Sequence, residues 1–267
     1  MRGLFLFFIL NFVNLLIVQT INASSNQAYQ DYLFQYDTYR TINAEFQTAR
    51  NEYETFQSLS SETAALHTVK TMMNQRAILL RTYIFLLKEK LYENQGLSKN
   101  EISSYVATLD SELNFLDSQK NEALSVNSIQ GAIDVSKKLE NHNIQFQITI
   151  DRTRIGLALG NLSVLSRTQD NAVSYAQKFL TDHKYAYPKE SYDKISRWTE
   201  KIVQSRESFI QSYDVLRQKN NSLNPTDIQT LTDLHNSLLK DIESARSLLI
   251  QCSSYLVELK NALKYAD

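Results

Sequence analysis

Glycine and proline are scarce in this 267-residue chain, which contains five glycines and two prolines. Globular proteins average about 7% glycine and about 5% proline, so this chain has few residues suited to sharp turns. A fold of many short strands joined by tight turns is therefore disfavoured, and a small number of long helices is favoured.

Cysteine is nearly absent, since Cys252 is the only one. An intramolecular disulfide is excluded, and a chain of this length can bury a substantial core without one. Because Cys252 falls within an apolar helical stripe, we expect its thiol to be buried rather than exposed or paired between chains.

An excess of charge of either sign is also missing, because 28 Lys and Arg residues nearly balance 29 Asp and Glu residues. No long-range field would attract nucleic acid or a strongly acidic partner. Fifteen tyrosines and twelve phenylalanines accompany a single tryptophan. Aromatic packing must rest on Tyr and Phe, and buried tyrosine hydroxyls will need hydrogen-bond partners.

Motifs that carry chemistry are lacking. The chain contains no HExxH, no GxSxG, no phosphate-binding glycine loop and no dinucleotide fingerprint. Its four histidines (His67, His142, His183 and His235) are scattered and none lies at metal-ligand spacing from another ligand type. Cys252 has no neighbours that would activate a nucleophile. We therefore predict no catalytic, cofactor-binding or metal-binding residues, no cofactor and no enzymatic activity.

The amino terminus has the three parts of a secretory signal. Arg2 precedes an apolar stretch from Leu4 to Val18 that two asparagines interrupt, and a small residue, Ala23, follows a short polar gap. We predict a signal segment over residues 1–23, cleavage after Ala23 and an extracytoplasmic location. An uncleaved anchor is the alternative, although the stretch is short for a membrane span of about 20 residues.

Apolar residues recur every three or four positions in six segments that are separated by Ser, Asn, Gly and Pro. The six predicted helices run from Gln27 to Leu59, from Ser60 to Gly96, from Ser98 to Val126, from Ser128 to His183, from Pro188 to Asn221, and from Asn224 onward. We expect a capping box at Ser98, a left-handed cap at Gly96 and an N-cap at Asn224.

One segment is ambiguous. Ile144, Phe146, Ile148 and Ile150 alternate with polar residues as they would in a strand. We interpret the segment as helical, because an isolated strand would have no partner.

The repeat of two apolar residues in seven is typical of helices that pack at shallow angles. We therefore predict an all-α, elongated bundle of about six long antiparallel helices with coiled-coil-like packing. The fourth helix is nearly twice as long as its neighbours, so we expect it to be shared by an N-terminal bundle (24–153) and a C-terminal bundle (154–267). Gly156 and Gly160 form a GxxxG pattern, which we interpret as close helix packing within the bundle.

These features indicate an exported, non-catalytic helical interaction or scaffold protein of the cell envelope or exterior. Its partner would be an unidentified protein or cell surface; nucleic acid is not expected, and membrane contact would require an uncleaved signal segment. A homo-oligomer remains open, because the apolar heptad of the last helix suits either an internal seam or a dimer.

Two other functions stay open. A bundle that binds a small ligand would need a deep cavity between its helices, and a solid seam would count against it. A membrane-active helical toxin would insert the GxxxG segment into a bilayer.

Overall fold

The computed structural model describes residues 23–182 and 187–264, which form six α-helices and no strand. The helices are α2 (Ala23–Phe56), α3 (Leu59–Glu93), α4 (Lys99–Ser125), α5 (Ile129–Asp182), α6 (Lys189–Asn221) and α7 (Ile228–Lys264). The predicted all-α bundle is confirmed, and the alternating segment from Ile144 to Ile150 is helical. The predicted signal segment, apart from Ala23, and His183 lie outside the described residues.

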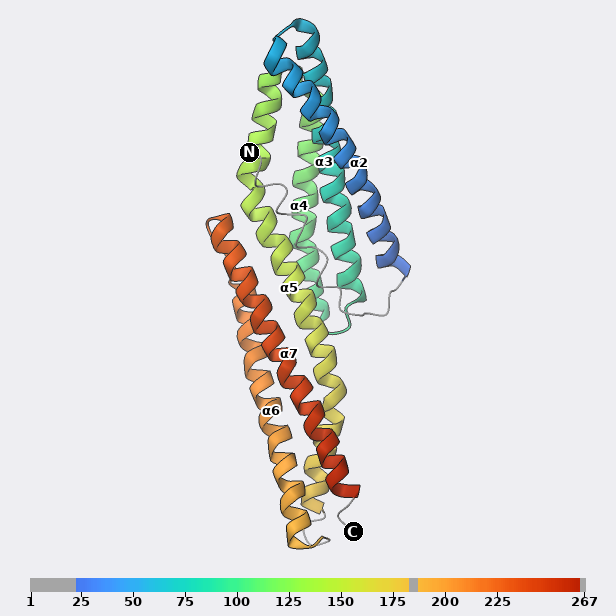
Figure 1. Ribbon diagram of the computed structural model, residues 1–267, viewed down its shortest axis with the longest axis vertical. Coiled ribbons are helices and arrows are strands. Elements are labelled where there is room, and N and C mark those ends of the chain that lie inside the picture. Colours follow the sequence, from blue (N-terminus) through green and yellow to red (C-terminus); the bar gives the residue numbers. More distant parts are fainter. Residues whose placement is uncertain (1–22, 183–186, 265–267) are drawn as a thin grey trace.

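The six helices form an elongated rod (Figure 1). α2 and α3 make an antiparallel hairpin at one end, and α6 and α7 make a second hairpin toward the other. α5 has 54 residues, about 80 Å at 1.5 Å per residue, and is the element that joins the two hairpins. Its first half packs against α3 and α4, whereas its second half packs against α6 and α7.

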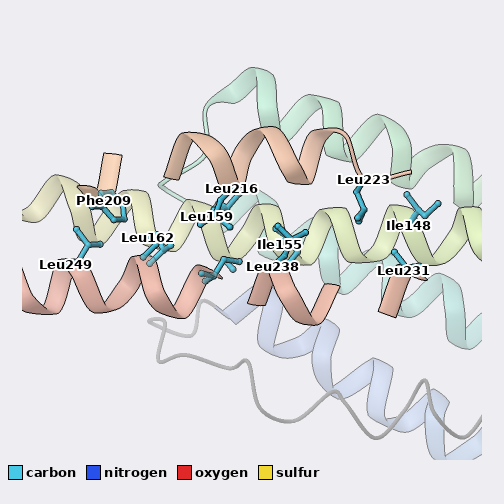
Figure 2. Packing of buried hydrophobic residues seen from close by; sticks show 13 residues of the cluster. Ile148, Ile155, Leu159, Leu162, Phe209, Leu216, Leu223, Leu231, Leu238 and Leu249 are labelled. Carbon is cyan, nitrogen blue, oxygen red and sulfur yellow. The ribbon is translucent and has the colours of Figure 1, made fainter. Parts of the chain in front are cut away.

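A predominantly aliphatic core fills the seam between α5, α6 and α7 (Figure 2). Leu231, Leu238 and Leu249 of the predicted heptad point inward and are at most 3% exposed. Residues spaced by seven return to the same side of a helix, so this side of α7 is covered by α5 and α6 along its length. The heptad therefore serves an internal seam of the monomer.

The cores of the N-terminal helices are more aromatic. Tyr83 and Phe146 are buried among leucines of α3 and α4, and Tyr39 packs with Met72 and Met73 nearer the α2–α3 turn. Along α5, Ile148 belongs to the C-terminal core and Ile150 to the N-terminal one. The two cores thus overlap along this helix, and a domain boundary between residues 153 and 154 stays a prediction.

Helix termini show which local signals were decisive. The capping box at Ser98 is confirmed: the Glu101 N–H donates to Ser98 Oγ (3.3 Å), and the Ser98 N–H donates to Glu101 Oε2 (2.9 Å). The start of α3 at Ser60 was wrong, because Ser58 is the cap and exchanges the same two hydrogen bonds with Ser61. Serine replaces the usual Glu or Gln in this box, so the standard pattern missed it.

Two further predicted caps were wrong. Gly96 does not take a left-handed conformation; instead Asn94 Oδ1 accepts the backbone N–H groups of Gly96 (2.9 Å) and Leu97 (3.0 Å), which closes the end of α3. Asn224 does not cap α7, because Asp227 accepts the Thr230 N–H (2.8 Å) and the helix begins after it.

Candidate functional site

The GxxxG pair lies at the junction where the two bundles meet. A Cβ on Gly156 would overlap the ring of Tyr105 in α4, and one on Gly160 would overlap the side chain of Asn94. A Cβ on Gly96 would in turn overlap the backbone carbonyl of Gly160, so Gly96 has no room for a side chain either. The interpretation of the GxxxG pattern as close packing within the bundle is confirmed.

Polar side chains tie the end of α6 to α4 and α5 at this junction. The Asn220 amide is 1% exposed and donates to Tyr105 Oη and to the Arg152 carbonyl, both at 3.0 Å. Arg217 donates to Glu101 Oε1 at 2.6 Å. These partners are 68 to 116 residues apart in the chain, so no local pattern could have identified them.

The space left between these side chains is very small. A slot lined by Tyr105, Tyr213, Arg217 and Asn220 has a volume of about 10 Å³. That is about the space of one water molecule and far below the roughly 300 Å³ at the lower end of small-molecule sites. The junction is a closed seam with no room for an organic ligand.

A group of ionisable side chains also lies where α5 meets α7. Asp151 Oδ1 is 3.3 Å from Arg154 Nη1 and 3.4 Å from His235 Nδ1, and the three side chains are 11–22% exposed. Burial raises the pKa of Asp151 to about 6, against the opposing pull of Arg154. Burial, with the charge of Arg154 in second place, lowers the pKa of His235 to about 4. Near neutral pH the imidazole is therefore uncharged and the carboxylate is ionised beside Arg154.

A second histidine is paired between α4 and α5. His142 Nε2 lies 2.6 Å from Glu112 Oε2, and the imidazole stacks on Phe115 with ring centroids 3.8 Å apart. Glu112 is 4% exposed, and its other oxygen accepts from the Thr149 hydroxyl at 3.2 Å. A carboxylate that orients an imidazole occurs in catalytic triads, but these contacts place no nucleophile beside the ring. The pair satisfies a buried carboxylate and links two helices.

The remaining sequence candidates are dispersed. His67 is exposed on α3, and no three His, Cys, Asp or Glu side chains of the described residues gather as metal ligands. Cys252 is fully buried, as predicted, and burial raises the pKa of its thiol. A thiol with a raised pKa is a poor nucleophile.

The larger hollow lies on the outside of the α2–α3 hairpin. It is an open groove of about 330 Å³ that includes Phe34, Phe85 and Asp31 in its lining. Phe34 is 67% exposed and Phe85 is 44% exposed. α3 is the only helix of the described chain whose backbone packs against that of α2. The outer face of this hairpin is therefore not covered by another described helix, and it carries exposed aromatic side chains.

None of the helices in the described residues is both long and apolar enough to span a bilayer. The chain matches no known family model, no curated protein and no solved structure with which it was compared.

Proposed function

We propose that the protein is an exported, non-catalytic helical scaffold that binds another macromolecule through its α2–α3 hairpin. The observation that supports this proposal most directly is the arrangement of that hairpin: among the described helices only α3 packs its backbone against that of α2, and aromatic side chains such as Phe34 and Phe85 remain exposed on the hairpin. Exposed aromatic groups on a rigid support are common at protein interfaces.

The alternative of a small-ligand-binding bundle receives less support. Such a site would need a cavity between helices, whereas the seam at the junction leaves about 10 Å³ and the larger hollow is an open surface groove. The alternative of a membrane-active toxin is also weakened, because both glycines of the GxxxG segment already pack against Tyr105 and Asn94. Liposomes that leak on addition of the mature chain would revive it.

Photo-crosslinking in the producing cell tests the scaffold proposal. A photoreactive phenylalanine analogue would replace Phe34 on the hairpin or, as a matched control, Ile250, which is 50% exposed on α7. We expect a stoichiometric protein or cell-surface adduct from position 34 and none from position 250. Turnover of any substrate by the purified chain, without such an adduct, would reject the proposal.

Export is tested separately by sequencing the amino terminus of the protein recovered outside the cytoplasm. We expect the mature chain to begin at Ser24. A chain that still carries residues 1–23 would support the retained anchor instead.

A further inference from the structure

The turn between α2 and α3 carries the most exposed large apolar side chains of the described residues. Phe56, the last residue of α2, is 71% exposed, and Leu59, the first of α3, is 81% exposed. Between residues 50 and 64 only the Ser61 side chain is buried and only Tyr53 is half-buried. An isolated exposed leucine is ordinary, but two such residues on either side of one turn make an apolar knob.

The knob projects beyond the rest of the molecule. The core cluster at this end of the rod extends to Phe46 of α2 and Leu66 of α3, and none of its members comes from residues 47–65 between them. Figure 1 shows the α2–α3 turn at the extreme end of the rod, past the start of α5. Phe56 and Leu59 are thus presented to the surroundings and not to another helix of the described chain.

The backbone of the turn is both constrained and strained. Gln57 has a φ of 45°, and it is the one non-glycine residue of the described chain with a positive φ. Its N–H donates to the Tyr53 carbonyl (3.0 Å), while Ser58 and Ser61 cap the next helix through reciprocal hydrogen bonds. Strain of this kind persists where surrounding contacts over-determine it, and it is concentrated at functional sites.

Acidic side chains outnumber basic ones around the knob. From residue 51 to residue 69 the chain contains three glutamates and no lysine or arginine. Glu54 is paired with Arg50 at 2.7 Å. Glu52 lies four residues before Phe56 and Glu62 three residues after Leu59, spacings that place each carboxylate on the same helix face as its apolar neighbour. The knob is therefore flanked by exposed acidic groups.

We propose that this tip is the contact point of the scaffold, inserting Phe56 and Leu59 into an apolar pocket of a partner protein whose edge carries Lys and Arg. The inference rests on the proposed function and specifies where and with what chemistry it acts. Charge complementarity favours a protein partner over a membrane, because exposed glutamates attract a basic rim and are repelled by an anionic bilayer. An aromatic and a leucine side chain, held on a fixed turn, lose little conformational freedom on insertion.

The experiment begins with the photoreactive phenylalanine analogue at position 56 of the full-length chain in the producing cell. Position 257 serves as the control, because Val257 is 56% exposed on α7. The protein crosslinked from position 56 is then purified, and its affinity for the mature chain is measured at low and high salt. Capture alone does not count as support.

Four variants decide the outcome. Phe56→Ser and Leu59→Ser should each weaken binding by about tenfold or more, the effect expected of a central anchor. Glu52→Lys with Glu62→Lys should weaken binding and abolish its decrease with salt. Val257→Ser should leave the affinity unchanged. All five substituted positions are exposed, so the variants should keep the circular dichroism spectrum and melting temperature of the parent.

Several results would overturn the tip assignment. Binding that is indifferent to Phe56→Ser and Leu59→Ser would do so, as would binding of the tip to phosphatidylglycerol–phosphatidylethanolamine vesicles. A partner crosslinked from position 34 and not from 56 would remove the tip assignment but leave binding through the hairpin standing, whereas a partner crosslinked only from position 257 would remove both. The absence of an adduct from every position would remove both.

Discussion

The C-terminal and N-terminal bundles are stabilised in different ways. The seam of α5, α6 and α7 is filled mainly by Leu and Ile that repeat at helical spacing. The N-terminal helices bury a carboxylic acid, Glu112, together with Gln75, Tyr83, Gln147 and Thr149, whereas the polar side chains buried beside the C-terminal seam, such as Gln169 and Ser205, carry no acidic group. A seam built on periodic apolar residues depends on volume and shape. A core that buries polar groups depends on individual hydrogen bonds.

The largest effect should come from a cavity in the aliphatic seam. Leu249 is fully buried there, so Leu249→Ala should lower the free energy of unfolding by about 3 kcal/mol. The neighbouring Ile250→Ala, on a side chain that is 50% exposed, should change it by less than about 0.5 kcal/mol. Urea denaturation measures both, and equal losses would contradict the assignment of this face of α7 to the core.

Asp151 and His235, which lie where the two bundles meet, should make opposing contributions to the pH dependence of the unfolding free energy. The folded pKa of Asp151 is raised to about 6, so its contribution is fully present below the unfolded value of 3.8 and is lost as pH rises through about 6. The folded pKa of His235 is lowered to about 4, so its contribution is present above 6.5 and is lost as pH falls through about 4. The two contributions oppose each other between about pH 4 and pH 6.

Replacing either residue alone should leave the pH dependence of stability that the other residue contributes. Relative to the parent chain, Asp151→Asn should lose about 2 kcal/mol of stability as pH falls from 6 to 4, and His235→Gln should gain a similar amount. Urea titrations at several pH values measure both slopes. If the unfolding free energy changed with pH in the same direction in both variants, the two contributions would not oppose each other.

The close approach of the two bundles should respond to one added methyl group. Gly160→Ala would force its Cβ into the Asn94 side chain and should cost about 1 to 2 kcal/mol, even though alanine is the better helix former. Gly131→Ala is the matched control in the same helix, because its Cβ would meet only Ser128 Oγ at 3.3 Å and Val126 Cγ1 at 3.7 Å. The control should be neutral or slightly stabilising in thermal unfolding.

The smallest effect is expected at the α2–α3 turn. Glycine adopts a φ of 45° without the steric cost that Gln57 meets, a cost of about 1 to 2 kcal/mol that the greater freedom of unfolded glycine partly offsets. Gln57→Gly should therefore raise the free energy of unfolding by about 0.5 kcal/mol. A loss of stability in chemical denaturation would show that the Gln57 side chain itself supports the turn.

The contrast between the bundles also explains how much the sequence could predict. Leu231, Leu238 and Cys252 belong to a repeat that is local in the chain, and their burial follows from the helical period alone. The capping box at Ser98 is equally local.

The polar contacts were not predictable in the same way. Asp214 lies three residues before Arg217, a spacing that suits a local ion pair, but Arg217 reaches Glu101 in another helix. Asn94 replaces a left-handed glycine because its amide also donates to Asn161 Oδ1 and the Leu157 carbonyl, groups more than 60 residues away. His142 and Asp151 likewise acquire their environments only from tertiary packing.

The continuity of α5 has a mechanical consequence. Because one helix of 54 residues belongs to both cores, no linker separates the two ends of the rod, and they cannot pivot about a loop. A helix of that length fixes a spacing of about 80 Å. Molecules bound at opposite ends would be held at a fixed separation, so the rod would act as a rigid spacer.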